Sequence, residues 1–270
     1  MRYITTKMVD KFPSISLNNF IKSNFEKKVE GYKHQSTFYY PLKGGIQAYI
    51  SALEKKCKNI STGCNVDKVY KKDDKWFVDI GGKIHVFDKL VSTIPLPELS
   101  KVMQLPVNVK KAINNLLYNN VNLILLGVKK KRKNPSWVYF PQETIPFHRA
   151  VFLNKCSPNL APNGCCGIIL EITVPPSSKG MYRNTVIKHC IRALRRSTIF
   201  SDCRIITNKF VSMPYAYIIY DTNHKNNMSI IREYFDKEDL VLAGRNGEFE
   251  YMNMDQCTER ALEVAQQLKR

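Results

Sequence analysis

The fold is decided by the stretch Leu240-Val-Leu-Ala-Gly-Arg-Asn-Gly-Glu-Phe-Glu-Tyr-Met-Asn-Met-Asp255, which joins a short apolar run, a glycine turn and the start of a helix. The run Val241–Gly244 predicts a short buried strand, and Gly244 and Gly247 bracket Arg245 in a sharp turn. Asp255 is expected to cap a helix over residues 256–268. A strand, a glycine turn and a helix N-terminus together favour a bound phosphate, but an ordinary α/β core contains the same succession without a ligand. The rest of the chain has to distinguish these two interpretations.

The length and composition are those of a folded globular protein. The 270 residues suffice for one large domain or two modest ones, and 44% of them are hydrophobic. No run is long enough for a membrane-spanning helix and the N-terminus has no signal-peptide pattern, so we expect neither feature. The eight cysteines are scattered without a C-x-x-C pair, which argues against a zinc framework or a disulfide scaffold and predicts a reducing, cytoplasmic environment.

The net charge of +19 raises the possibility of a nucleic-acid or anionic-surface partner. The lysines are spread along the chain, however, often beside asparagine, as a compositional bias would place them. The one dense run, residues 129–133, is expected to form an exposed loop between a strand and Trp137. No motif combines basic residues with stacking aromatic residues, so nucleic-acid binding is disfavoured.

The N-terminal part predicts a linker, a helix and a small sheet. Residues 1–37 are polar and basic, and we expect a linker or a substrate-domain segment there. Gly44 and Gly45 precede a predicted helix over residues 46–56, and their bare N–H groups suit an anion or a flat ring, or simply a loop-to-helix turn. The apolar residues of this helix recur at helical spacing and predict a buried face: Ile46, Tyr49, Ile50 and Leu53.

Four short strands are predicted next. Residues 65–69, 76–80 and 84–87 alternate or are apolar, and Gly81-Gly82 joins the last two as a hairpin. The apolar segment Leu90–Pro95 predicts a fourth strand, with a helix beginning near Pro97.

Taken in order, these motifs resemble the flavin amine oxidase superfamily, and most closely its protoporphyrinogen-oxidase-like and UDP-galactopyranose-mutase-like members. The motifs are Tyr40-Pro-Leu-Lys-Gly-Gly45, the strand with Val66, the hairpin, Phe87-Asp-Lys-Leu-Val-Ser-Thr-Ile-Pro95, and Ala243 to Asp255. The resemblance extends from about Phe38 to the end of the chain. It implies an α/β (α+β) fold, with a Rossmann-type FAD-binding domain interrupted by a substrate domain.

The middle of the chain agrees with the expected substrate domain. Four apolar segments predict an antiparallel sheet and one amphipathic segment predicts a helix: residues 121–128, 137–141, 146–152 and 167–173, and residues 186–195. Residues 215–221 resemble the segment that returns the chain to the cofactor domain. The resemblance thus implies a partial FAD-binding domain over residues 38–100, a substrate domain over residues 101–220 and a C-terminal return over residues 221–270.

The resemblance also implies roles for individual residues. Gly44 and Gly45 would approach the flavin ring, and Val66 would lie by the adenine. Gly244 and Arg245 would lie near the pyrophosphate and ribityl chain. The remaining implied residues are Met254 and Asp255, which would place the last helix against the flavin, and Tyr139, Tyr217 and Tyr251, which could line a substrate pocket.

Arg149 is a substrate-site candidate because it lies between apolar neighbours on a predicted strand. A buried arginine must find a carboxylate or a phosphate, and the mutase-like families place an arginine near the substrate phosphates in a similar context. An outward-facing arginine in solvent is an equally good interpretation. The histidines His148 and His189 show no pattern for metal binding or triad chemistry, so no metal is expected.

One expected feature is missing: the fingerprint G-x-G-x-x-G that opens a dinucleotide-binding domain occurs nowhere in the chain. The FAD-binding domain is therefore predicted to be incomplete, the product of a truncated or split gene, or one completed by a separate chain. We expect weak FAD binding or none by this chain alone. Three functions stay open: an FAD-dependent oxidoreductase acting on a small molecule, a flavin-dependent sugar-nucleotide mutase, and a non-enzymatic basic binding protein.

Overall fold

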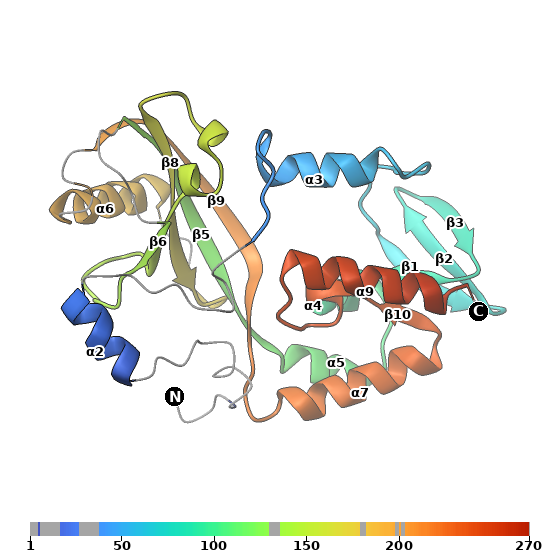
Figure 1. Cartoon of the computed structure of the whole chain (residues 1–270). Helices are drawn as coiled ribbons and strands as arrows, with labels where there is room; N and C mark the ends of the chain where they lie inside the picture. Colours follow the sequence, from blue (N-terminus) through green and yellow to red (C-terminus); the bar gives the residue numbers. More distant parts are fainter. Residues whose placement is uncertain are drawn as a thin grey trace. The chain divides into compact units, whose positions relative to one another are not determined.

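A computed structural model describes residues 5, 17–26, 38–129, 136–178, 182–197, 200 and 203–269 (Figure 1). Of the predicted basic loop at residues 129–133 only Lys129 is described, and most of the predicted linker at residues 1–37 lies outside these ranges. The chain forms two compact units. Unit 1 comprises Met1–Thr5, Asn59–Asn120 and Pro214–Arg270, and unit 2 comprises Thr6–Lys58 and Val121–Met213.

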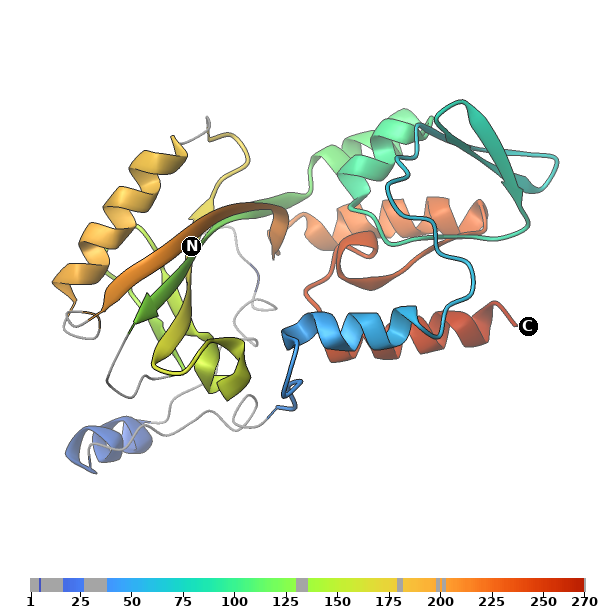
Figure 2. The same ribbon diagram turned by 90° about the horizontal axis from the view of Figure 1, so that it is seen from above.

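Unit 1 contains a parallel pair of strands that joins two distant motifs. Strand β4 (Leu90–Ser92) pairs with β10 (Leu240–Leu242), with Leu90 opposite Leu240 and Ser92 opposite Leu242. Both strands were predicted; Leu240 and Leu242 of β10 are buried in the core of the unit, whereas Val91 of β4 is 38% exposed. The helices of this unit are α4 (Leu96–Val102), α5 (Val107–Asn114), α7 (His224–Lys237), the single turn α8 (Gly244–Gly247) and α9 (Met254–Gln267). Helices α5 and α7 lie side by side (Figures 1 and 2).

The predicted cap of the last helix was wrong. Helix α9 begins at Met254, and its N-cap is Asn253, not Asp255. Asn253 has extended backbone angles (φ −80°, ψ 173°), which an N-cap needs, whereas Asp255 already lies in the first helical turn. The side chain of Gln256 accepts a hydrogen bond from the Asn253 N–H at 2.9 Å and completes a capping box.

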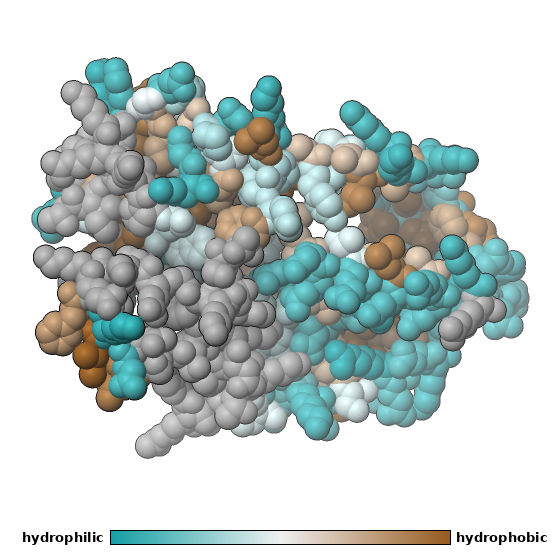
Figure 3. All heavy atoms as spheres, viewed as in Figure 1, coloured by the Kyte–Doolittle hydropathy of each residue, from teal (hydrophilic) through white to brown (hydrophobic). Residues whose placement is uncertain are grey.

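The predicted hairpin is confirmed in a three-stranded antiparallel sheet of β1 (Lys68–Lys72), β2 (Lys75–Ile80) and β3 (Lys83–Phe87). Gly81 and Gly82 both have positive φ angles, 61° and 82°, which a two-residue hairpin turn requires. The first strand starts at Lys68, later than predicted, and just before it the Asp67 carboxylate accepts the Gly81 N–H at 2.6 Å. Figure 3 shows hydrophobic side chains on the outside of this hairpin, where Ile84 and Val86 are exposed.

Unit 2 is built on a five-stranded sheet in the order β6-β7-β8-β5-β9. Its strands are β5 (Leu117–Lys129), β6 (Trp137–Tyr139), β7 (Arg149–Phe152), β8 (Cys165–Val174) and β9 (Arg204–Ile219), and β5 and β9 continue into unit 1. The pairs β6–β7 and β7–β8 are antiparallel, as predicted. Helix α6 (Arg183–Arg196) packs along one face of the sheet (Figures 1 and 2) and contributes Val186, Cys190 and Leu194 to the core.

Unit 2 also contains two helices before the sheet, α2 (Leu17–Glu26) and α3 (Gly45–Glu54), and two short 3-10 turns, Leu153–Lys155 and Pro158–Leu160. Helix α3 was predicted, but the buried face predicted for it was wrong. Ile46, Ile50 and Leu53 are 40–46% exposed. Helical spacing shows that these side chains share a face, but it does not supply a surface that covers the face.

Among the described residues, no helix is both long enough and apolar enough to cross a lipid bilayer.

Candidate functional site

The predicted site residues fall in both units, and each unit is described by itself. Unit 1 contains Val66, Tyr217, Gly244, Arg245, Tyr251, Met254 and Asp255, and unit 2 contains Gly44, Gly45, Tyr139 and Arg149. We predicted that the turns at Gly44-Gly45 and Gly244-Arg245 meet around one cleft. These turns belong to different units, so their meeting stays a prediction.

The glycine turn after β10 lies at the carboxyl end of the parallel pair of strands. Gly244 has a φ of +73°, and no atom lies within 4 Å of the position that a Cβ would occupy. Gly247 is packed tightly, because its Cβ would lie 2.5 Å from the carbonyl oxygen of Ser92. The Ser92 hydroxyl is buried and has no hydrogen-bond partner among the described residues. The turn therefore combines open space beside Gly244 with an unsatisfied hydroxyl at the end of β4.

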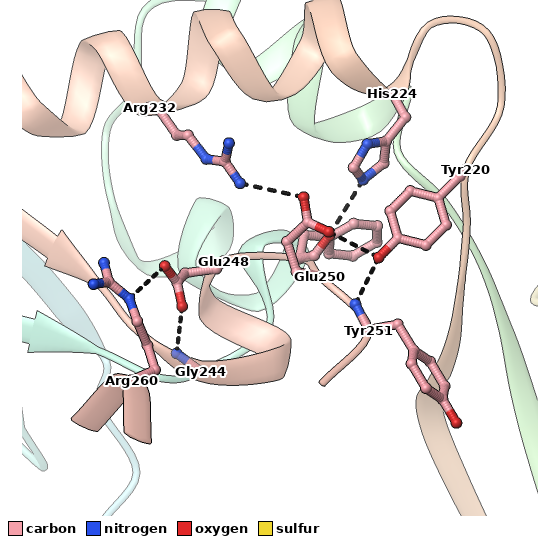
Figure 4. Close-up of polar contacts among 9 residues, drawn as sticks. Tyr220, His224, Arg232, Gly244, Glu248, Glu250, Tyr251 and Arg260 are labelled. Carbon is pink, nitrogen blue, oxygen red and sulfur yellow. Dashed lines mark hydrogen bonds and ion pairs between the residues drawn. The ribbon is translucent and has the colours of Figure 1, made fainter. Parts of the chain in front are cut away.

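The first amide of this turn already donates a hydrogen bond to a carboxylate. Glu248 accepts a hydrogen bond from the Gly244 N–H at 3.0 Å and another from the Arg260 Nε at 2.8 Å (Figure 4). The side chain of Glu248 is 14% exposed, so this bond is partly sheltered from water. A phosphate placed on the Gly244 amide would have to displace the carboxylate, and the N-terminus of α9 is already capped by Asn253.

Arg245 lies between two tyrosine rings. Its guanidinium carbon is 4.4 Å from the centre of the Tyr251 ring and 5.9 Å from that of Tyr217, and these rings are nearly parallel. The guanidinium also donates to the carbonyl oxygens of Met252, at 3.3 Å, and Ala216. These bonds use two of its five N–H donors. The structure thus brings together Arg245, Tyr217 and Tyr251, which the resemblance had placed in separate cofactor and substrate sets.

A buried polar network beside this cluster was not foreseen. The Tyr220 hydroxyl donates to Glu250 at 2.8 Å and accepts the Tyr251 N–H at 2.7 Å (Figure 4). Arg232 pairs with Glu250 at 3.3 Å, and the His224 ring contacts the carbonyl oxygen of Phe249. Burial is the main cause that raises the pKa of Tyr220, so its hydroxyl stays protonated and available as a donor. No sequence spacing links these residues, because they come from different elements.

Replacing Tyr220 with phenylalanine is expected to destabilise unit 1 by about 1.5–3 kcal/mol. The change removes a hydroxyl that donates to Glu250 and accepts the Tyr251 N–H, so both of these hydrogen bonds are lost. Urea unfolding followed by circular dichroism measures the loss. A change below about 0.5 kcal/mol would show that water replaces the hydroxyl fully.

In unit 2, Gly44 and Gly45 start helix α3 with positive φ angles of 78° and 62°. Gly44 is the N-cap of α3. Because glycine has no side chain, Gly44 offers no side-chain acceptor to the first amides of the helix. Gly45 is buried, and a Cβ would lie 3.3 Å from Leu160 and 3.6 Å from the Tyr40 hydroxyl. The preceding loop is anchored through Leu42, whose carbonyl oxygen accepts from Ser157 at 2.5 Å and from Asn159 at 3.0 Å.

The Arg149 guanidinium is hydrogen-bonded to a carboxylate. It donates to both oxygens of Glu171, at 2.6 and 2.8 Å, and its guanidinium carbon lies 5.9 Å from the centre of the Tyr139 ring. Glu171 is directly opposite Arg149 in the β7–β8 register and is only 8% exposed. The sequence pattern missed Glu171, because its partner lies 22 residues away across a strand pair. Arg149 and Tyr139 thus lie together, and their predicted role in a substrate pocket stays a prediction.

His148 extends this cluster. Its Nε2 lies 3.6 Å from a Glu171 oxygen, and its Nδ1 lies 3.2 Å from the Thr173 hydroxyl. Burial lowers the pKa of His148, the Glu171 charge raises it, and Arg149 lowers it again, with a net shift downwards. Because the unfolded histidine takes up its proton at a higher pH, the stability linked to neutral His148 is present above about pH 6.5 and is lost as the pH falls towards the folded pKa.

An NMR titration of the histidine ring protons is expected to place the midpoint of His148 below the ordinary value of about 6.5. Changing Glu171 to glutamine should move this midpoint further down, because it removes the charge that raises the pKa of His148. A midpoint that rises in the variant would show that the carboxylate is not the stabilising charge.

The other predicted residues lie apart from these clusters. Val66 precedes β1, beside a different sheet from the glycine turn, and is 36% exposed. Met254 and Asp255 form the first turn of α9 and are exposed. Their predicted contacts with a cofactor stay predictions.

Comparison with known proteins supports the resemblance. The family model described as flavin containing amine oxidoreductase matches residues 11–268. Among solved structures, reduced UDP-galactopyranose mutase matches with a TM-score of 0.79 and 20% identity, over 91% of this chain and 55% of that one.

Two further solved structures have similar folds. A protein provisionally named a protoporphyrinogen oxidase, from an Exiguobacterium species, has a TM-score of 0.69 and 13% identity, over 83% of this chain and 51% of its own. The CLA-producing fatty acid isomerase from P. acnes has a TM-score of 0.62 and 14% identity, over 82% and 52%. The chain therefore spans about half the length of the solved structures that it matches, and identities this low show the fold alone. By its match to the family model, the chain belongs to the flavin containing amine oxidoreductase family.

Proposed function

We propose that this chain is the C-terminal part of an FAD-dependent oxidoreductase that acts on a small molecule in the cytoplasm. The observation that carries the proposal is the parallel pairing of β4 with β10, which places Ser92 and Gly244 at one carboxyl edge. Open α/β sheets bind their ligands at that edge. The buried Ser92 hydroxyl and the open space beside Gly244 fit a ligand there.

The residues of unit 1 fit one part of a flavin site. Gly244 would allow close approach of the cofactor. Arg245 contacts two tyrosine rings and donates to two carbonyl oxygens, and its remaining N–H donors would bind the cofactor. FAD, when bound, supplies the redox chemistry, and the protein supplies position and charge. Arg149 and Tyr139 of unit 2 are the proposed substrate contacts, with Glu171 holding the guanidinium in one orientation.

The residues that cradle the pyrophosphate are proposed to lie on polypeptide that this sequence does not contain. The sequence has no G-x-G-x-x-G, and the first amide of the C-terminal glycine turn is already bonded to Glu248. Among the described residues the parallel sheet has only two strands, β10 and β4. A further strand added to this sheet would carry the missing glycine loop to the same carboxyl edge, whether it belongs to the same gene product or to a separate chain.

Flavin titration tests the proposal. Purified chain mixed with FAD is expected to bind weakly, and co-expression with a family N-terminal segment that carries G-x-G-x-x-G is expected to yield a yellow, stoichiometric complex. A stoichiometric complex of the chain alone would contradict the need for a second segment. Failure to take up FAD under both conditions, with the chain folded by circular dichroism, would contradict the flavoprotein assignment itself.

A flavin-dependent sugar-nucleotide mutase is the second candidate, supported by the fold similarity to reduced UDP-galactopyranose mutase. Incubation of the flavin-loaded complex with UDP-galactopyranose under reducing conditions separates the two candidates. Ring contraction without net oxidation would favour the mutase.

A further inference from the structure

The exposed face of helix α6 is strongly basic. Lys188, Arg192, Arg195 and Arg196 all point away from the core, while Val186, Cys190 and Leu194 of the same helix are buried against the sheet. The helix contains no acidic residue. Among the described residues, no carboxylate lies within 4.0 Å of any of the four cations. The face therefore carries a concentrated positive charge without a neutralising partner in that part of the chain.

The composition of this helix departs from that of the chain. The sequence contains 30 lysines and 12 arginines, whereas α6 contains one lysine and four arginines. A general bias towards lysine explains the charge elsewhere but not this reversal. Arginine differs from lysine in its planar fork of N–H donors, which binds phosphate oxygens in pairs. The substitution pattern of α6 thus points to phosphate and not merely to solubility.

The basic residues border an open hollow on the exposed face of α6. Lys188, Arg192, Arg195 and Arg196, together with Ile191, line a volume of about 420 Å³ that is open to solvent. Lys188, Arg192 and Arg196 follow one another at intervals of four residues, so like charges face each other along the helix and repel. The helix dipole favours cations only in the last turn, which accounts for Arg195 and Arg196 but not for Lys188 and Arg192.

We propose that this hollow is a binding site for a ligand that carries two or more adjacent phosphate groups. A terminal phosphate brings about −1.5 to −2 charges near neutral pH and each linked phosphate adds about −1, so a short run of phosphates matches four cations. The volume of this hollow is in the range that holds a small ligand. Among the described residues, none that lines the hollow is aromatic and could stack a base, which favours recognition of phosphate over recognition of a base sequence. The site is independent of the flavin proposal.

Calorimetric titration of the full chain with inorganic tripolyphosphate tests this proposal. We expect saturable binding with one site per chain, and a loss of at least about tenfold in affinity in the double variant Arg192→Gln/Arg195→Gln. The matched control is Arg183→Gln, because Arg183 lies on the same helix but outside the hollow, over the ring of Phe210 at 5.7 Å. This control should change the affinity by less than about twofold.

Three results would overturn the proposal. Equal weakening by Arg183→Gln would show that only the diffuse charge of the helix matters. No saturable tripolyphosphate binding would exclude the site. Tight binding to RNA or to vesicles of phosphatidylserine, without competition by tripolyphosphate, would assign the basic face to a macromolecule instead.

The variants are first compared by circular dichroism to show that α6 is intact. If the double variant does not fold, Arg192→Lys keeps the charge and removes only the planar fork. Weaker tripolyphosphate binding by this variant supports the proposal, and unchanged binding contradicts it.

Discussion

Replacing Glu171 with leucine is expected to lower the free energy of unfolding by about 3 kcal/mol. The carboxylate is 8% exposed and bonds Arg149 at 2.6 and 2.8 Å, with His148 at 3.6 Å. Its loss leaves a guanidinium half-buried without its carboxylate, which costs far more than the pair itself contributes. Because the Arg149 side chain is 29% exposed, the effect falls at the lower end of the range for buried pairs. Urea unfolding at pH 7 measures it.

The double variant Arg149→Met/Glu171→Leu is the control for this prediction. It removes both charges and fills the same volume with apolar atoms, so it should recover most of the lost stability. If the double variant is as unstable as the single one, packing around Glu171 and not the unpaired charge is responsible. The same variant should abolish any role of Arg149 in substrate binding, because no guanidinium remains.

Replacing Gly247 with alanine is expected to cost about 3 kcal/mol and to disturb the proposed cofactor edge. A Cβ at this position would lie 2.5 Å from the Ser92 carbonyl oxygen and 3.2 Å from the Thr93 Cα. Both are backbone atoms, so a change of side-chain rotamer cannot relieve the clash. Instead, α8 would have to move away from the end of β4. The midpoint of urea unfolding reports the stability, and FAD uptake by the completed protein should fall with it.

Gly244 provides the matched control in the same turn. Alanine there meets no atom within 4 Å but must adopt a φ of +73°, which costs about 1–2 kcal/mol. Asparagine, which tolerates this conformation better, should cost less than alanine. If Gly244→Ala were as damaging as Gly247→Ala, the close approach to Ser92 would not be the cause.

Local patterns in the sequence were sufficient for several elements and for the family, but they did not predict α5, α7 or most of β9. The alternation around Gly81-Gly82 predicts the hairpin, and the apolar runs at residues 90–95 and 241–244 predict two strands, which the structure pairs in parallel over residues 90–92 and 240–242. These features depend on backbone conformation and on side-chain periodicity, which neighbouring residues determine. The order of the motifs is a property of the chain, so the flavin amine oxidase resemblance needed no coordinates and is confirmed by the family match.

Only the tertiary structure decided which polar and charged groups form hydrogen bonds and ion pairs with one another. The partner of Arg149 is Glu171, the Gly244 amide is bonded to Glu248, and the N-cap of α9 is Asn253. Residues far apart in the chain meet through strand register and helix packing, and a short polar segment offers several side chains for one cap. The sequence by itself therefore determined several of the elements and the family to which the chain belongs. Folding decided the partners of the charged groups, because the energy of a buried charge depends on the three-dimensional neighbours that replace its water.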